Sequence, residues 1–453
     1  LKNILNDMVF SIINIKRDML FCVFNIIYFV LLLGKNIIYM FTGKDWYVHF
    51  SAEVKQETLI VLYISLFSLL IGNILYQIVL FLRDKKKREE EIRIKEKIEK
   101  YFESRKRYIQ IISRYAFYVS IVFATIVTIE KVIFVYNSSY LELYNTFETK
   151  LPNIFAKIAE THFLFLSMYL ATIPERKKML RTIAIYFIYL ILTLLIGSRG
   201  ELVVQTIFIG IYLFYRQTKG DIYYTKKVMI ALIMLLIISL GFLSTYNLIR
   251  NNIEIKNFDF LKQVKQFFID QGASGDTLAY SIKHKKELQE LGQNYTFGFF
   301  ANYLKYGHIS KIIGTYQERI LDKEHIALND NNLGASISYI VLGSRYLNGE
   351  GLGTQYLAEL YVDYSYYGII IYNIILGFLL SLLMKINLKD WGLFSIILFL
   401  IPKIIYIPRQ FASDWLIYIL SLTVYAQFVF VIGVSEILYK KKRDEKNENT
   451  LDC

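Results

Sequence analysis

Long apolar runs separated by short polar segments dominate the pattern of hydrophobic and polar positions along the chain. The run from Val228 to Tyr246 (VMIALIMLLIISLGFLSTY) is apolar on every helical face, whereas a surface helix in water keeps a polar face. An apolar helix of about 20 residues crosses the hydrocarbon core of a bilayer. The pattern predicts about ten such helices, at 18–40, 57–82, 109–135, 154–173, 180–197, 201–215, 227–247, 357–384, 391–408 and 414–438.

The charges beside these spans predict their orientation. Basic residues concentrate in four connections and the C-terminal tail, at 83–107, 175–181, 216–227, 385–390 and 440–449. Short cytoplasmic loops carry an excess of Lys and Arg, and all five segments fall on one side if both termini are cytoplasmic. The span 201–215 is short, but without it the basic connection 216–227 would lie outside. The segment 83–107 predicts a charged, solvated helix on the cytoplasmic side.

The spacing of the spans divides the chain into three parts. Residues 1–247 form an N-terminal membrane region with seven spans, and residues 357–453 form a C-terminal membrane region with three spans and a cytoplasmic tail. Between them, 248–356 is a large external loop, and loops of this length are usually functional or separately folded. Within it, 258–272 and 279–292 have the pattern of amphipathic helices.

Composition and charge support a membrane protein. Hydrophobic residues make up 55% of the 453 residues and charged residues 20%, which is typical of a chain with many spans. The net charge of +13 lies beside the ends of the apolar runs, so we interpret it as topological and expect no nucleic-acid partner. The two cysteines, Cys22 and Cys453, offer no disulfide framework or metal-ligand spacing.

Four arginines fall at or beyond the outer ends of the predicted spans: Arg199, Arg250, Arg345 and Arg409. The guanidinium fork stays charged and binds phosphate oxygens in pairs, so these residues are candidates for an anion site at the membrane surface. The alternative is an arginine at a helix end whose charged head reaches water.

Two tight outer turns hold the strongest candidates. Arg199 lies in Gly197-Ser198-Arg199-Gly200-Glu201 (GSRGE) between two spans, where the glycines allow a backbone to approach a ligand. The alternative is a hairpin turn in which the acid caps the next helix. Arg409 lies in YIPRQFASDW (406–415), with Lys403 about one and a half helical turns before it. Its alternative role is an ion pair with Asp414.

Carboxylates and a histidine are candidates for proton transfer. Glu359 opens the eighth span, with Asp363 one turn further, although an acid at this position also stabilises a helix N-terminus. Glu160 and His162 lie within the fourth span, where ionisable groups suggest function, and a structural hydrogen bond between helices is the alternative. Three histidines in the external loop lack metal-ligand spacing, and we assign none of them as a ligand: His284, His308 and His325.

Taken together, these motifs resemble those of the Wzy-type polymerases of O-antigen or capsule repeat units. The resemblance rests on the GSRGE turn after a middle span, the large external loop, the segment GSRYLNGEGLGTQYLAELYVDYSYYGIIIYNIILG (343–377) and the outer PRQF turn (408–411). It covers about Leu180 to Asp414. Two positions depart from the family pattern. Tyr364 to Gly368 replaces an aspartate-phenylalanine-glycine-like stretch, and Gln410 stands where a glycine often follows the arginine.

The resemblance implies an all-α polytopic enzyme of the GT-C-like class in the bacterial cytoplasmic membrane. Such a glycosyltransferase joins undecaprenyl-diphosphate-linked oligosaccharide repeat units on the outer face, with a chain-length regulator and a flippase as partners. We assign Arg199 and Arg409 to the diphosphate, Arg250, Arg345 and Lys403 to further substrate contacts, and Glu359 to the role of base or acceptor-positioning residue. The outer loops hold no Asp-x-Asp motif, so we expect a reaction without metal or cofactor.

Three other functions fit parts of the pattern. A transporter that flips lipid-linked sugar also needs many spans and cationic groups, but it should carry polar groups through the whole bilayer depth. An O-antigen ligase shares the donor and the outer loop and passes the glycan to a different acceptor. A non-catalytic scaffold of a polysaccharide assembly complex would tolerate the loss of each arginine.

Overall fold

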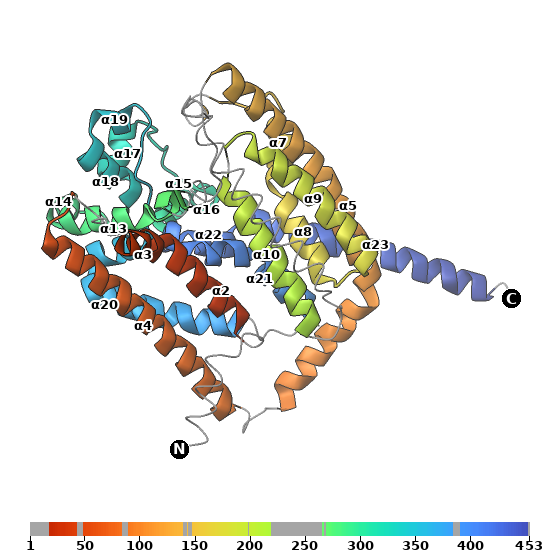
Figure 1. The fold of residues 1–453 in the computed structure, drawn as a ribbon. Helices are drawn as coiled ribbons and strands as arrows, with labels where there is room; N and C mark the ends of the chain where they lie inside the picture. Colours follow the sequence, from red (N-terminus) through yellow and green to blue (C-terminus); the bar gives the residue numbers. More distant parts are fainter. Residues whose placement is uncertain are drawn as a thin grey trace. The chain divides into compact units, whose positions relative to one another are not determined.

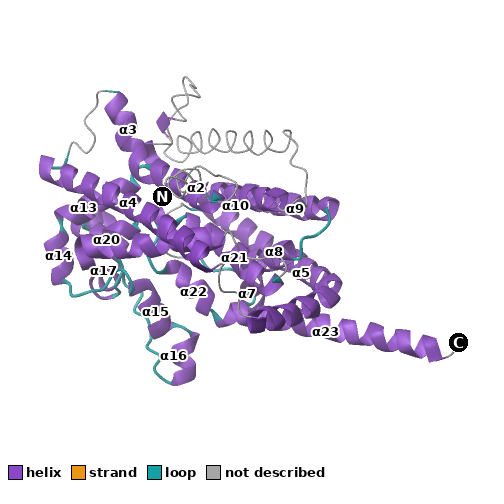
Figure 2. Cartoon of the chain, turned by 90° about the horizontal axis from the view of Figure 1, so that it is seen from below, coloured by secondary structure: helices purple, strands orange, loops and turns teal. Residues whose placement is uncertain are grey.

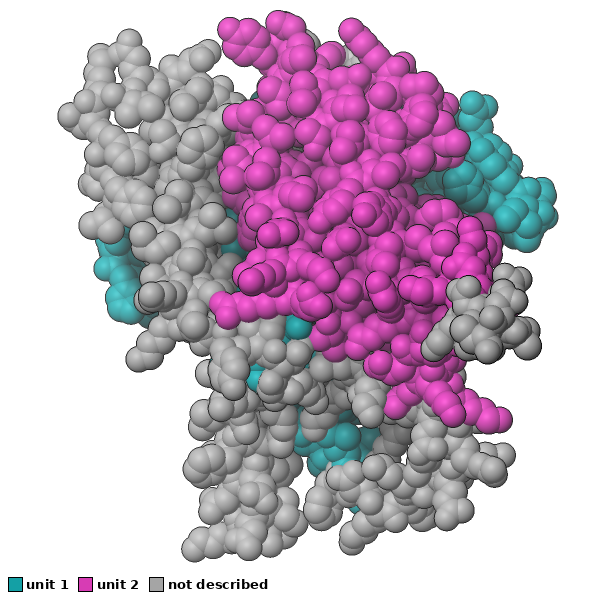
Figure 3. Space-filling model, turned by 90° about the vertical axis from the view of Figure 1, so that its right-hand side faces the viewer, with its two compact units in different colours: residues 1–82, 203–385, 402–417 teal, residues 83–202, 386–401, 418–453 magenta. Residues whose placement is uncertain are grey.

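The computed structural model describes residues 18–42, 49–83, 89–138, 143, 147–197, 199–218, 265–266, 269–383 and 390–451. Over these ranges the regular elements are α-helices with one π-helical and one 3-10 turn, and no strand occurs in them (Figures 1 and 2). The chain divides into two compact units, coloured separately in Figure 3. Unit 1 comprises residues 1–82, 203–385 and 402–417, and unit 2 comprises 83–202, 386–401 and 418–453.

Within the described residues, six helical segments are long and apolar enough to cross a membrane: Met19–Phe41, Ala52–Leu80, Glu99–Asn137, Asn153–Ala171, Tyr356–Leu383 and Leu422–Glu445. Predicted spans 180–197, 201–215 and 391–408 coincide with α9 (Arg176–Leu194), α10 (Arg199–Thr218) and α21 (Trp391–Ile405). The predicted span 227–247 lies outside the described residues. The structure therefore agrees with a multi-pass helical membrane protein.

The last predicted span needs correction. The stretch 414–438 is not one helix but α22 (Asp414–Leu420) followed by α23 (Leu422–Leu451), with Ser421 between them. Hydropathy alone misses such a break, because Ser421 is flanked by apolar residues on both sides.

Small residues bring two long helices of unit 1 close together. A β-carbon added at Gly72 of α4 (Ala52–Arg83) would collide with the carbonyl oxygen of Ile374, and one at Gly377 of α20 (Tyr356–Leu383) with that of Leu69. Glycine permits this approach between backbones, as small residues do at helix crossings in membranes.

A bend interrupts α20 on its N-terminal side. Ser365 has φ 53° and ψ −142°, so residues 356–364 and 366–383 form two helical halves. The positive φ of Ser365 breaks the regular helical backbone and changes the direction of the helix. The sequence predicted one continuous span over 357–384, so this bend is a correction to that prediction.

We call the described residues of the predicted external loop 248–356 the external segment, and their side of the membrane stays a prediction. Seven short helices make up most of this segment: α13 (Ser274–Lys283), α14 (Lys285–Glu290), α15 (Gly298–Tyr306), α16 (His308–Ile313), α17 (Lys323–Asn329), α18 (Leu333–Leu342) and α19 (Ser344–Leu347). The stretch 279–292, predicted as helical, is divided between α13 and α14 at His284. Most of the other predicted helix, 258–272, lies outside the described residues. Asp330 ties this segment together, accepting from Tyr306 Oη at 3.1 Å and Arg319 Nε at 2.8 Å.

The N-terminal helices belong to unit 1 as well. α2 (Met19–Tyr28) continues through a π-helical turn, η1 (Phe29–Leu33), into α3 (Gly34–Phe41). Lys35 of α3 donates to Asp276 of α13 at 2.5 Å, and a β-carbon at Gly272 would collide with Lys35. Helix α3 is thus fastened to the external segment.

Unit 2 is built on α5 (Glu89–Asn137), a single helix of 49 residues. It packs against α7 (Asn153–Glu160), α8 (His162–Ala171), α9 and α23. The charged helix predicted for 83–107 is confirmed from Glu89 onward, as a continuation of the apolar part of α5.

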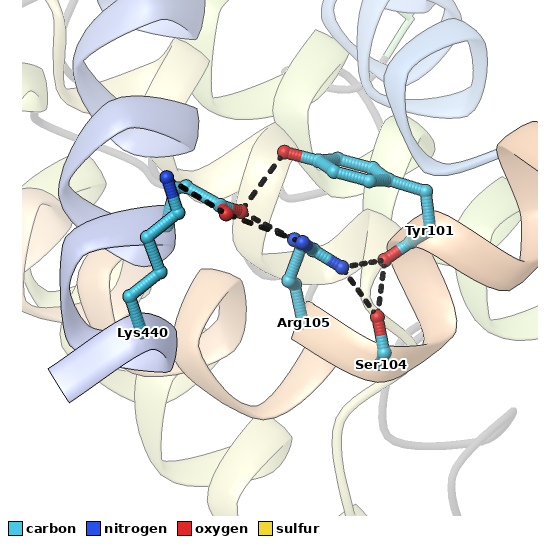
Figure 4. Close-up of polar contacts among 5 residues, drawn as sticks. Tyr101, Ser104, Arg105 and Lys440 are labelled. Carbon is cyan, nitrogen blue, oxygen red and sulfur yellow. Dashed lines mark hydrogen bonds and ion pairs between the residues drawn. The ribbon is translucent and has the colours of Figure 1, made fainter. Parts of the chain in front are cut away.

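An aromatic and ionic cluster fastens α5 to α23 (Figure 4). The Arg105 guanidinium lies 3.8 Å from the ring centroid of Tyr101 and 4.4 Å from that of Tyr439. Its Nε and Nη2 both donate to the Glu436 carboxylate, the latter at 3.2 Å, and Tyr101 Oη donates to the same carboxylate. Planar stacking and a two-pronged ion pair need arginine rather than lysine.

Candidate functional site

Glu359 is the centre of the polar site in unit 1. It lies in the first turn of α20 with no exposed surface, and its two carboxylate oxygens have different partners. One oxygen accepts from Thr354 Oγ1 at 2.6 Å, and the other accepts from the backbone N–H of Ala412 at 2.8 Å. A buried carboxylate needs such donors, because leaving it unsatisfied would be costly.

The residues around Ala412 form a tight turn, which we call the Arg409 turn (407–413). It begins as the 3-10 helix η2 (Ile407–Arg409) after α21 and ends before Asp414 opens α22. The Ala412 carbonyl accepts from Tyr372 Oη at 2.6 Å and from Trp415 Nε1 at 3.1 Å. α20 therefore holds both backbone polar groups of Ala412, one through Glu359 and one through Tyr372.

Two buried polar atoms in this region have no hydrogen-bond partner within the described residues. They are Nε2 of Gln355, one turn before Glu359, and Oγ of Ser413, next to Ala412. The other end of the Gln355 amide accepts from Ala358 N–H at 2.7 Å. Native proteins pair most buried polar groups, so unpaired ones beside a buried acid are consistent with a binding site.

Arg409 is half-buried and contacts the external segment. Its Nη1 donates to the side-chain oxygen of Gln271, and two residues later the Phe411 ring stacks on Phe299 of α15, 4.5 Å between centroids and nearly parallel. The guanidinium is thus oriented by a neutral amide rather than by a carboxylate. The predicted alternative, a pair with Asp414, is not among the contacts that Arg409 makes in the described residues.

Lys403 belongs to the same neighbourhood. It is half-buried in the last turn of α21, and its charge acts on the carboxylate of Asp414, which is buried at the start of α22. Lys403, Arg409 and Glu359 are therefore all placed in unit 1 around one short turn.

Arg345 is differently placed. It lies in α19 with 64% of its side chain exposed, and it is paired with Glu350. The pair raises the pKa of Arg345 and lowers that of Glu350. Within the described residues, no hydrogen bond or ion pair joins Arg345 to Glu359 or to the Arg409 turn.

The other two arginines are not placed in the site. Arg199 is the first residue of α10, and its side chain lies outside the described part of the chain, as does Arg250 altogether. Gly197, two positions earlier, has φ 95°, which favours glycine in this turn. Glu201 lies in the first turn of α10, as the capping alternative requires.

Two of the predicted histidines, His162 and His284, have local contacts. His162 Nδ1 lies 2.7 Å from the carbonyl of Ala159, while Glu160 is exposed. In the external segment His284 Nδ1 is paired with Glu287 at 2.9 Å. Among the described residues, no three His, Cys, Asp or Glu side chains form a group that could hold a metal ion.

The sequence did not single out Glu57 and Lys285. Glu57 accepts hydrogen bonds from Tyr361 and Tyr366 of α20, and Lys285 of α14 donates to Ser365 at 2.5 Å. The available signal was weak: Glu57 is the first residue of the predicted span 57–82, and Lys285 is one of several lysines in an amphipathic helix.

Comparison with known proteins identifies the family. The model of the family described as O-antigen polysaccharide polymerase Wzy matches residues 2–442, nearly the whole chain. No match was found among curated proteins or among solved structures. Membership implies a membrane protein that polymerises lipid-linked oligosaccharide repeat units, which favours a polymerase over the transporter, ligase and scaffold alternatives. The chain belongs to the O-antigen polysaccharide polymerase Wzy family.

Proposed function

We propose that this polymerase is a glycosyltransferase that works at the outer face of the bacterial cytoplasmic membrane, and that the Arg409 turn binds the diphosphate of its lipid-linked donor. Undecaprenyl diphosphate as the carrier, a chain-length regulator and a flippase as partners, cytoplasmic termini and the GT-C-like class stay predictions. The same holds for the roles of Arg199, Arg250, Arg345 and Lys403 in binding substrate.

The proposed reaction transfers the growing glycan to a new repeat unit. A hydroxyl at the non-reducing end of the lipid-linked acceptor attacks the anomeric carbon of the donor glycan. The bond from that carbon to the diphosphate oxygen breaks, the lipid diphosphate leaves with the electron pair, and the hydroxyl proton passes to a base or to solvent. The largest charge develops on the leaving diphosphate, so cationic donors placed beforehand stabilise the transition state.

Arg409 is well suited to that role. A guanidinium offers five N–H donors, and Gln271 orients the group through one nitrogen without neutralising its charge. Lys403, placed nearby in unit 1, adds a second positive charge. We assign the diphosphate to Arg409, with Lys403 as a predicted further contact.

Glu359 serves this site as a positioning residue. Both of its carboxylate oxygens are bonded, and it has no exposed surface, which does not favour direct proton transfer from an acceptor hydroxyl. The observation that carries the proposal is the pair of hydrogen bonds by which Glu359 and Tyr372 hold Ala412, three residues after Arg409. A fixed backbone there gives the guanidinium one orientation, which is what electrostatic catalysis requires.

The experiment compares arginine variants in cells that lack the gene. Wild type, Arg409→Ala, Arg409→Lys and Arg199→Ala are expressed at equal membrane level, with Arg176→Ala, an exposed arginine of α9, as the matched control. We expect Arg409→Ala to shorten the polysaccharide ladder to single repeats while lipid-linked repeat units accumulate at the outer face. Arg409→Lys should remain strongly impaired, because it keeps the charge and loses the fork.

Other outcomes separate the alternatives. A normal ladder in Arg409→Ala would remove Arg409 from the site. Accumulation at the cytoplasmic face would instead indicate a transporter, and long glycan that is made but not passed to its final acceptor would indicate a ligase.

A further inference from the structure

The bend of α20 at Ser365 lies between the candidate site and the rest of the helix. A φ of 53° with a ψ of −142° is a backbone conformation that glycine adopts readily and that serine adopts at a cost in strain. Such a conformation persists only where the surrounding structure enforces it. Ser365 follows Glu359 by six residues, so the bend sets the direction of the half-helix that carries Glu359.

Helix α14 holds the bend through two side-chain hydrogen bonds. Lys285 Nζ donates to Ser365 Oγ at 2.5 Å, and Gln289 Nε2 donates to the carbonyl of Val362 at 2.7 Å. In an uninterrupted helix that carbonyl would accept from the backbone four residues later, so the bend exposes it and the Gln289 amide supplies a donor. Lys285 and Gln289 are four residues apart, on one face of α14.

Helix α4 also holds the bend. Glu57 Oε1 accepts from Tyr361 Oη at 2.5 Å and from Tyr366 Oη, which lie on opposite sides of Ser365 in the chain. A single carboxylate oxygen therefore connects the two halves of α20. Tyr361 and Tyr366 also contact each other edge to face, 5.8 Å between ring centroids.

The charges of Lys285 and Glu57 interact electrostatically, and Tyr361 contacts both residues. The Lys285 ammonium lies 4.2 Å from the centroid of the Tyr361 ring whose hydroxyl bonds Glu57. Burial lowers the pKa of Lys285, and the negative charge of Glu57 opposes that effect. Both charges are thus fixed close to the bend.

Further contacts hold the half-helix 356–364 itself. The Asp363 carboxylate accepts from the backbone N–H of Thr296 at 2.7 Å, and Asn294 Nδ2 donates to Tyr364 Oη at 2.7 Å. The external segment thus binds the half-helix at its C-terminal end, while Glu359 binds the Arg409 turn near its N-terminal end.

We propose that Glu57 and Lys285 are positioning residues for polymerisation: together they hold the Ser365 bend, and the bend places Glu359 and with it the Arg409 turn. This inference rests on the function proposed above for that turn. Six residues at 1.5 Å each place Glu359 roughly 9 Å from the bend. A change of about 20° in the half-helix therefore moves its carboxylate by about 3 Å, and a misplacement of about 1 Å can lower a rate roughly 100-fold.

The test uses the difference between glycine and alanine at position 365. Initial rates and acceptor KM are measured with full-length purified protein and lipid-linked repeat units. The variants are Lys285→Ala alone, then combined with Ser365→Gly or with Ser365→Ala. Lys286→Ala, an exposed neighbour on α14, is the matched control. Melting temperatures and membrane levels are recorded for each variant.

We expect Lys285→Ala to lower kcat at least about tenfold with little change in acceptor KM, because the site is displaced rather than removed. Ser365→Gly should restore most of the rate, since glycine adopts the bent conformation without help from Lys285. Ser365→Ala should restore nothing, because alanine keeps the strain and lacks the hydroxyl. If Lys285→Ala fails to fold, the same rates are measured for Glu57→Leu, alone and combined with Ser365→Gly. This pair of variants removes the contact that α4 makes with the bend.

Two results would overturn the inference: normal rates in both Lys285→Ala and Glu57→Leu, or impaired rates that Ser365→Gly fails to restore. Either can occur while Arg409→Ala abolishes polymerisation, in which case the proposed function stands and only the positioning role fails. If Arg409→Ala polymerises normally, the proposed function fails independently of position 365.

Discussion

The carboxylate of Glu359 accepts a hydrogen bond at 2.8 Å from the backbone N–H of Ala412, a residue 53 positions later in the chain. The bond joins the first turn of α20 to the turn that carries Arg409. Both partners are buried, so the bond is shielded from competition by water. Its role in positioning, as opposed to proton transfer, leads to a direct test.

Glu359→Gln should retain much more activity than Glu359→Ala. The amide oxygen of Gln can accept from the Ala412 N–H, and its NH2 can donate to Thr354, whose hydroxyl rotates to accept. Glu359→Gln therefore keeps both contacts without a charge, and we expect its rate to stay within about tenfold of wild type, whereas Glu359→Ala should lose about 100-fold. Initial rates of polymerisation measure the effect of both substitutions. Glu324→Gln is the control, because the Glu324 carboxylate accepts an exposed hydrogen bond from Tyr339 away from the Arg409 turn. Equal losses in the two variants would assign Glu359 as the base.

Gly377→Ala should destabilise the protein, and Gly433→Ala should not. The alanine β-carbon at 377 would collide with the carbonyl oxygen of Leu69 on α4, so the two backbones must separate. We expect a loss of about 1–3 kcal/mol, seen as a lower melting temperature in detergent. A β-carbon at Gly433 of α23 meets nothing within 4 Å, and alanine there favours the helix by up to about 1 kcal/mol. Similar melting temperatures for both variants would contradict the close packing of α4 on α20.

Asp276→Asn should affect stability in a pH-dependent way. Burial raises the pKa of Asp276, an effect that Lys35 opposes, and Oδ1 of the carboxylate has no partner among the described residues. A carboxyl group whose pKa is raised on folding contributes stability below its unfolded pKa and loses that contribution as the pH rises through the folded value. We therefore expect Asp276→Asn to melt no lower than wild type at neutral pH, with its relative advantage shrinking as the pH falls toward 3.8, the ordinary value for this group. A variant that melts lower, and increasingly so at higher pH, would show that the ion pair with Lys35 outweighs burial.

Arg105→Lys should weaken the junction of α5 with α23. Lysine keeps the positive charge but cannot reproduce the two-pronged contact with Glu436 or the stacking between Tyr101 and Tyr439. We expect a loss of roughly 1.5–3 kcal/mol, the range for hydrogen bonds to charged groups. Thermal unfolding measures it, with Arg443→Lys on the exposed end of α23 as the control. An unchanged melting temperature would mean that the cluster contributes nothing to stability.

Polymerisation in purified membranes should continue after chelation of divalent ions. The argument rests on charge, because Arg409 and Lys403 can balance the leaving diphosphate as a metal would. The ladder is compared before and after chelation and again after Mg²⁺ or Mn²⁺ is restored. A specific requirement for the added ion would replace this prediction with a metal-assisted reaction.

The candidate site was predictable only in part. Arg409 was singled out as an outer guanidinium that can bind phosphate oxygens, and Glu359 as a carboxylate at the start of a span that could take part in proton transfer. The hydrogen bond from Ala412 to Glu359 was not predicted, because nothing in either segment specifies a partner 53 positions away in the chain. Glu57 and Lys285 were missed for a similar reason: each resembles an ordinary residue at a helix end, and only the bend at Ser365 distinguishes them.

The sequence by itself determined the class of protein, the approximate places of most membrane helices and the family, because hydrophobicity over some 20 residues and short motifs are local properties. The tertiary structure decided the bend in α20, the division of 414–438 into two helices, and the contacts made by Glu359. These depend on the backbone conformation of single residues such as Ser365 and on contacts between distant segments. Such features arise from packing and hydrogen bonding in three dimensions, which no local pattern of residues records.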